Sequence, residues 1–93
     1  MVIAFVFIQA RKDLIPETGE RLAELPGVAE VYSVTGPWDL IAVLRLKDLE
    51  ALDEVVTRGI HALAGVEKTE THLAFRTYPR KLLDQGFSLG AAP

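Results

Sequence analysis

The 93-residue sequence contains no cysteine, no asparagine and a single methionine, Met1. Without cysteine the chain can form no disulfide, no thiolate zinc site and no cysteine nucleophile, and this composition fits a cytoplasmic protein. A scarcity of thermolabile residue types is typical of heat-adapted sources. An apolar core must therefore hold the chain together.

Neither a large excess of one charge nor a long hydrophobic run is present. Ten basic and thirteen acidic residues give a net charge of -3, so the chain lacks the positive field that neutralises a phosphate backbone. The apolar run after Met1 is too short to span a bilayer and lacks the positive flank of a signal peptide. We therefore expect neither direct nucleic-acid binding nor a membrane partner.

What the sequence does contain is apolar surface. Hydrophobic residues make up 49% of the chain and the mean hydropathy is +0.23. A domain of this length buries only about 60 to 65% of the surface that its unfolded chain exposes. Some of the remaining apolar surface needs cover from outside the chain.

A four-residue pattern occurs twice. The stretch "LPGV" at 25–28 recurs as "LAGV" at 63–66, each after a helical pattern and before a β-rich stretch. The chain is therefore expected to consist of two similar half-units.

The first half-unit predicts a strand, a helix and a second strand. Residues 2–9 form an apolar run that suits a buried strand, and 28–35 are rich in β-branched residues. Between them, Asp13 is expected to cap a helix that tolerates Pro16 in its first turn. One helix face carries residues at spacings of four and three, namely Leu14, Thr18, Leu22 and Leu25.

The second half-unit repeats this order. Residues 40–46 predict a strand, and Asp48 is expected to cap a helix that ends near Gly65. Residues 66–78 predict the last strand, which Pro79 would end. The apolar stripe of the helix is Leu49, Leu52, Val56, Ile60 and Leu63.

The order βαββαβ predicts an α+β, ferredoxin-like domain over residues 1–80. Right-handed crossovers give an antiparallel sheet in the order 4-1-3-2 with both helices on one face. The nearly apolar strands 2–9 and 40–46 suit the centre, and the two charged strands suit the edges. Residues 81–93 form a C-terminal tail, in which Leu82, Leu83 and Phe87 are candidates for packing on a neighbouring subunit.

The helix-free face of this sheet predicts a homodimer. Side chains alternate between the two faces of a strand, and in strand 2–9 both faces are apolar. The same holds for strand 40–46. We expect Val2, Val6 and Ile41 on the helix-free side. A bare apolar face of this size is unusual for a monomer, and a second copy packing sheet to sheet would cover it.

The corner between the two middle strands, "TGPWD" at 35–39, admits two interpretations. In the first, Gly36 takes a positive φ, Pro37 fixes the next residue, and Asp39 bonds backbone amides of the turn. In the second, the corner binds a small zwitterion. Asp39 then accepts the ammonium group, free amides and the Thr35 hydroxyl hold the carboxylate, and Trp38 forms an apolar wall.

Other polar residues also have two interpretations. Thr69 and Thr71 share one face of their strand, either as ordinary edge-strand residues or as ligand contacts. His61 suits a solvated position near a helix end, and His72 lies on the strand face opposite Thr71, within reach of a subunit contact. The sequence shows no metal-ligand spacing, no Ser-His-Asp arrangement and no phosphate loop.

Two stretches resemble a known family. "TGPWDLIAVLRL", followed by a helix and "LAGVEKTETHLAF", is similar to the effector-binding RAM domain of the leucine-responsive regulatory protein and AsnC (Lrp/AsnC) family. The resemblance covers residues 1–80. The residues that match the two family motifs are Gly36, Trp38 and Asp39 for the first, and Gly65, Val66, Thr69 and Thr71 for the second.

The resemblance implies a dimer through the sheet faces, dimers assembled into an octamer or similar ring, and an amino acid bound between dimers. The ligand-binding residues that it implies are Thr35, Gly36, Trp38, Asp39, Thr69 and Thr71. It implies no metal or cofactor. Because the chain has no room for the family's helix-turn-helix domain, we expect a stand-alone RAM protein that affects transcription by co-assembly with full-length Lrp/AsnC regulators.

Two alternatives stay open. A dimeric α+β barrel enzyme shares this fold but would need His61 or His72 in a pocket with a partner acid, and we see no such pairing in the sequence. Another ferredoxin-like regulator, such as an ACT-type domain, would also fit. The sequence favours a regulatory, non-enzymatic module.

Overall fold

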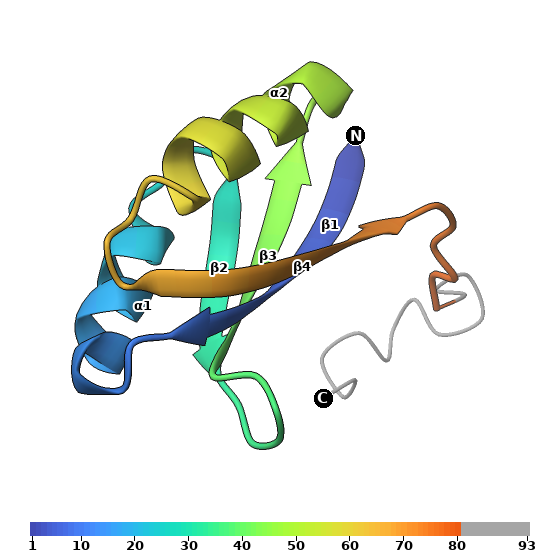
Figure 1. The fold of residues 1–93 in the computed structure, drawn as a ribbon. Helices are drawn as coiled ribbons and strands as arrows, with labels where there is room; N and C mark the ends of the chain where they lie inside the picture. Colours follow the sequence, from blue (N-terminus) through green and yellow to red (C-terminus); the bar gives the residue numbers. More distant parts are fainter. Residues whose placement is uncertain (81–93) are drawn as a thin grey trace.

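The computed structural model describes residues 1–80 as four strands and two helices in the order βαββαβ (Figure 1). The elements are β1 (Val2–Ala10), α1 (Ile15–Ala23), β2 (Val28–Ser33), β3 (Leu40–Leu46), α2 (Leu49–Glu54) and β4 (Val66–Ala74). A 3-10 turn (Lys12–Leu14) precedes α1, and a π-helical segment (Val55–Ile60) extends α2. Within residues 1–80 no helix is long and apolar enough to cross a membrane. The predicted tail, 81–93, lies outside the described residues.

The strands form one antiparallel sheet in the order β2-β3-β1-β4, which is the predicted order read from the opposite edge. The apolar strands β1 and β3 are central and the charged strands β2 and β4 are edges. Both helices lie against the same face of the sheet (Figure 1). The ferredoxin-like α+β fold is confirmed.

The core lies between the helices and the even-numbered residues of the two central strands. β1 and β3 pair with Val6 opposite Ala42 and Phe7 opposite Ile41. Val6 is fully buried beneath the helices, and Val2 packs against the same core. The expectation that Val2 and Val6 share the helix-free side with Ile41 was therefore wrong, because the register places only Ile41 there. The buried strand residues of the core are Ala4, Val6, Ile8, Ala10, Leu40, Ala42, Leu44 and Leu46.

The helix-free side, which we call the open sheet face, has an apolar centre and polar borders. Its apolar centre consists of Ile3, Phe5, Phe7, Ile41 and Val43. On the β2 border, the Arg45 guanidinium lies 3.2 Å from the Glu30 carboxylate, which also accepts a hydrogen bond from the Tyr32 hydroxyl. Phe5, at the middle of the face, is 36% exposed. The single chain therefore leaves aromatic surface uncovered.

Four predicted element ends were wrong, and one of them is the end of the second helix, expected near Gly65 and found at Ile60. Asp13 does not cap α1 but pairs with Arg11 at 2.8 Å, and α1 begins at Ile15 with Pro16 in its first turn, as expected. β2 ends at Ser33, and β4 ends at Ala74, well before Pro79. Ala74 lies opposite Ile3, near the start of β1, so almost no partner strand remains beyond it.

The second helix changes its winding halfway. Asp48 caps it as predicted, accepting a hydrogen bond from the Ala51 amide at 2.8 Å. From Val55 onward the turns widen, and the His61 amide bonds to the Val56 carbonyl at 3.0 Å. The predicted stripe holds for Leu52, Val56, Ile60 and Leu63, which belong to the core or pack against it. Leu49 is instead 59% exposed, and Val55, outside the stripe, is buried.

The glycines of the repeated pattern allow close packing. Gly27 has a φ of +89°, and a Cβ there would lie 2.1 Å from a methyl of Leu46. A Cβ on Gly65 would lie 2.1 Å from the Thr18 hydroxyl of α1. Each half-unit thus needs a glycine where its helix returns to the sheet.

Candidate functional site

The corner between β2 and β3 spans residues 34–39 and projects beyond the sheet (Figure 1). Gly36 adopts a φ of +101°, as predicted for this turn. Thr35, Gly36 and Pro37 are exposed, whereas Trp38 and Asp39 are half-buried. The corner therefore presents one solvent-facing side and one side packed on the protein.

Three hydrogen bonds fasten the corner to the end of β1. The Asp39 amide donates to the Ile8 carbonyl at 2.9 Å, and the Ala10 amide donates to Asp39 Oδ2 at 2.9 Å. The Gln9 side-chain amide donates to the Pro37 carbonyl at 3.0 Å. Asp39 thus bonds an amide of the neighbouring strand, and not an amide of the turn as the first interpretation had it. This anchoring fixes the position of the carboxylate.

The second oxygen of this carboxylate is paired with a lysine. Lys12 Nζ lies 2.8 Å from Asp39 Oδ1, and the two side chains are 81% and 13% exposed. The hydrogen bond from Lys12, followed by that from the Ala10 amide, lowers the pKa of Asp39 from its usual value. The corner therefore carries a fixed, ionised carboxylate at neutral pH.

The corner also has unused hydrogen-bond donors. Among residues 1–80, the backbone amides of Thr35, Gly36 and Trp38 have no hydrogen-bond partner, and neither does the Thr35 hydroxyl. Exposed amides and a hydroxyl in a short turn can bind a carboxylate. The corner thus offers both an acceptor for a cation and donors for an anion.

Trp38 lies over one end of the open sheet face. Its ring centroid is 6.1 Å from that of Phe7, and Lys68 Nζ is 5.8 Å from the indole ring. Phe7 in turn lies 5.0 Å from the His72 ring. The apolar wall of the corner is therefore continuous with the open sheet face.

Thr69 and Thr71 do not meet the corner within one chain. They lie on the helix side of β4, opposite Ile8 and Val6, with β1 between them and the β2–β3 hairpin. Thr69 Oγ1 lies 3.0 Å from His61 Nε2. The structure brings together Thr35, Gly36, Trp38 and Asp39, but not the two threonines of β4.

A histidine–carboxylate pair escaped the sequence reasoning. His72 Nε2 lies 2.5 Å from Glu70 Oε2 on the open sheet face. The available signal was their spacing of two residues on one strand, which places both side chains on the same side. Both side chains are more than half exposed, unlike the acid-base pair in a pocket that a barrel enzyme would require. Within residues 1–80 no group of three or more potential metal ligands occurs.

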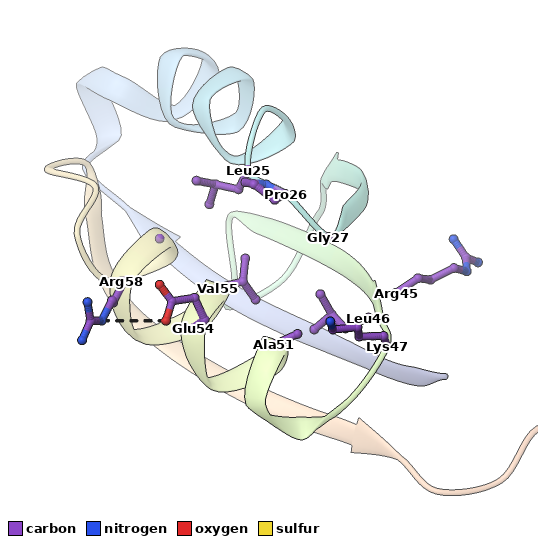
Figure 2. Close-up of a pocket in the computed structure, with 11 residues that line it drawn as sticks. Leu25, Pro26, Gly27, Arg45, Leu46, Lys47, Ala51, Glu54, Val55 and Arg58 are labelled. Atoms are coloured by element: carbon purple, nitrogen blue, oxygen red, sulfur yellow. Dashed lines mark ion pairs between the residues drawn. The ribbon is translucent and has the colours of Figure 1, made fainter.

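An apolar groove lies at the other end of the β2–β3 hairpin, between the two helices (Figure 2). Leu25, Leu46, Ala51 and Val55 line it. Two arginines at its rim lie in ion pairs: Arg58 lies 3.9 Å from Glu54, and the Arg45 side chain extends away from the groove towards Glu30. Lys47 is exposed at the same rim. The groove is thus mainly apolar, whereas the corner combines an anchored carboxylate with amide donors.

Comparison with known proteins identifies the same family as the sequence motifs. The model of the Lrp/AsnC ligand binding domain matches residues 3–82. The HTH-type transcriptional regulator Ptr1 of Methanocaldococcus jannaschii is 30% identical over 77 residues, which are 83% of this chain and 52% of the regulator. The chain thus spans about half the length of the curated relatives it matches.

Solved structures show the same relationship. TTHA0845 from Thermus thermophilus is 64% identical, with a TM-score of 0.83 over 86% of this chain and 100% of that protein. The feast or famine regulatory protein Rv3291c from M. tuberculosis, solved in complex with L-methionine, is 26% identical, with a TM-score of 0.69 over 87% of this chain and 54% of that protein. The resemblance of the two sequence motifs is thereby confirmed over most of the chain: it belongs to the Lrp/AsnC ligand-binding domain family.

Proposed function

We propose that the chain is an amino-acid-binding, self-associating regulatory module that influences transcription through other proteins and is not an enzyme. The carrying observation is that five consecutive residues, 35–39, combine an ionised carboxylate, free amide donors and an indole. A zwitterion with an apolar side chain complements all three. The family of transcriptional regulators to which the chain belongs, and the methionine held by one similar structure, support this proposal.

In the proposed complex the ammonium group of the amino acid binds Asp39. The carboxylate of the amino acid accepts hydrogen bonds from the amides around Gly36 and from the Thr35 hydroxyl. The side chain of the amino acid packs against Trp38. The two charged groups of the ligand thus meet groups of complementary charge or hydrogen-bonding character, and its apolar side chain meets an apolar ring.

The assembly proposed for the module follows from the open sheet face. A second copy covers this face, and several such dimers form an octamer or a similar ring. Because Thr69 and Thr71 lie on the helix side of β4, away from Trp38, they would contact a ligand from a neighbouring copy. The ligand would therefore lie between dimers, with residues 1–80 as the assembling domain.

The proposed partners are full-length Lrp/AsnC regulators in the cytoplasm. Co-assembly with them would connect amino-acid binding to DNA, for which this acidic chain offers no positive field of its own. A ligand that binds one assembly better than another shifts the population by that difference in affinity.

The sole tryptophan of the chain provides the assay. Titration with each of the twenty standard L-amino acids, followed by Trp38 fluorescence, should give a saturable change for at least one, and native mass spectrometry should show the ligand retained in the oligomer. Asp39→Asn should abolish the fluorescence response, because the asparagine side chain carries no charge for the ammonium group. Its amide oxygen can still accept the hydrogen bond from the Ala10 amide, so the corner should stay in place. Asp13→Ala, at the same end of the sheet, is the matched control. Silence with every amino acid, in an intact oligomer, would refute the proposed ligand.

A further inference from the structure

Resting on the proposed function, we propose that Lys12 competes with the ligand for Asp39. Lys12 Nζ already occupies the carboxylate oxygen that the ammonium group of an amino acid would use. The ligand must therefore displace this lysine, and Lys12 sets both the affinity of the corner and its selectivity for ligands that carry an ammonium group.

Both oxygens of Asp39 already accept a hydrogen bond. Oδ2 accepts from the Ala10 amide at 2.9 Å, and Oδ1 is held by Lys12 at 2.8 Å. The Asp39 side chain is only 13% exposed, and its backbone is fastened to Ile8 and Val34. The carboxylate cannot rotate to offer a second free edge without breaking its bond to β1.

The local charges favour exchange over simultaneous binding. Two ammonium groups on one carboxylate leave a net positive charge at a half-buried position, and like charges at contact distance repel. Among residues 1–80, Lys12 forms an ion pair with Asp39 alone, and the nearby Asp13 accepts two hydrogen bonds from the Arg11 guanidinium, at 3.2 and 2.8 Å. A ligand ammonium that reaches Asp39 therefore sends Lys12 into solvent.

Lys12 can leave easily. Its side chain is 81% exposed and extends on a flexible stem from the 3-10 turn that follows β1. Exchange replaces one ion pair by another, so the number of ion pairs does not change. Ionic strength should then affect ligand affinity weakly in the wild type, and more strongly once Lys12 is removed, because a new screened pair forms.

The test compares Lys12→Met with Lys47→Met, which removes the same charge from an exposed site at the opposite end of the sheet. Each standard L-amino acid is titrated by Trp38 fluorescence into both variants and the wild type. Lys12→Met should bind the responding amino acids about two- to fivefold more tightly, the range expected for losing a competing, mostly exposed ion pair. Lys47→Met should match the wild type. The N-acetyl derivatives, which lack the ammonium group, should show no gain.

Each outcome is decisive. Weaker or unchanged binding by Lys12→Met, while the wild type still binds, would overturn the competition and leave the proposed function standing. Tighter binding by Lys12→Met than by the wild type and Lys47→Met would support the competition. Silence of all three proteins, with circular dichroism showing them folded, would overturn both proposals. A steeper salt dependence in Lys12→Met and in Lys12→Gln is the second readout, and equal salt dependence in all variants would count against displacement.

Discussion

Asp39 stabilises the folded chain whether or not a ligand is present. Its carboxylate joins the corner to the amide of Ala10, a residue that is 1% exposed, and to Lys12. A buried amide that loses its acceptor destabilises the fold. Asp39 is thus suited to ligand binding and also stabilises the fold. A substitution at this position should therefore remove the charge but keep the hydrogen bond to Ala10.

Acid should reveal this contribution. Because hydrogen bonds from Lys12 and Ala10 lower the pKa of Asp39 below its usual 3.8, folding favours the charged form. Its contribution is full above that usual value and is lost as the pH falls through the lower folded-state pKa. We expect the urea midpoint of the wild type to exceed that of Asp39→Asn near neutral pH, and the gap to close below about pH 4. A gap independent of pH would contradict this.

At this scale, local backbone chemistry could be predicted and distant partners could not. The positive φ of Gly36 and the cap at Asp48 follow from the residue and its immediate neighbours. The side-chain partners of Asp39, Ala10 and Lys12, are more than twenty residues away in sequence. Asp13 forms an ion pair with Arg11 and does not cap α1. Only the fold determines such pairs.

Among the elements, the return from α2 to β4 depends on a close contact. Gly65 is buried, and a Cβ there would meet the Thr18 hydroxyl, itself in a buried residue of α1. The repeated four-residue pattern draws attention to Gly65 in the sequence. The requirement for glycine, however, comes from its contact with α1 in the folded chain. The contact holds α1 next to the start of β4.

Gly65→Ala should therefore destabilise the domain by about 1 to 3 kcal/mol, the usual effect of overpacking. Gly19→Ala is the control: its Cβ would find its nearest neighbour, a methyl of Leu40, at an ordinary 3.6 Å. Removing a glycine from the middle of α1 should stabilise it by about 0.5 to 1 kcal/mol. Urea unfolding of both variants measures the two changes, and a neutral Gly65→Ala would show that α1 can move aside.

The existence and order of the elements were predictable, but some of their ends and their winding were not. Apolar runs, β-branched residues and helical spacing together predicted the four strands and the two main helices. β4 ends where β1 stops providing partners, and the π-helical segment appears where the helix packs with Val55 inward. Both depend on what lies opposite the segment in space.

At the scale of the whole molecule, the open sheet face is the proposed interface between copies. Phe5 lies at its centre and is 36% exposed in the single chain. A carboxylate placed there would be buried without a partner in a sheet-to-sheet dimer, which is strongly unfavourable.

Phe5→Glu should therefore shift the protein towards monomer in sedimentation at micromolar concentration, whereas the wild type should sediment as a dimer or a larger assembly. Leu49→Glu, an equally drastic change at a 59% exposed position on α2, should leave association unaltered. Equal dissociation in both variants, or a monomeric wild type, would contradict the proposed interface.

The topology could be read from strand polarity, since the apolar strands had to be central. The sequence could not show which of the two apolar faces of β1 packs against the helices, because this depends on the register that pairs Phe7 with Ile41. A complete candidate site was also out of reach. The corner and the two threonines of β4 do not meet within one chain, and the sequence does not show how copies would be arranged.

The contact between Trp38 and Phe7 has one more consequence. A single aromatic neighbour connects the ligand corner to the surface that copies would share, so occupancy of one and pairing at the other act on one equilibrium, and each must influence the other equally. If the ligand favours association, a higher protein concentration would raise the affinity for the amino acid, and dilution would have the same effect as removing the amino acid.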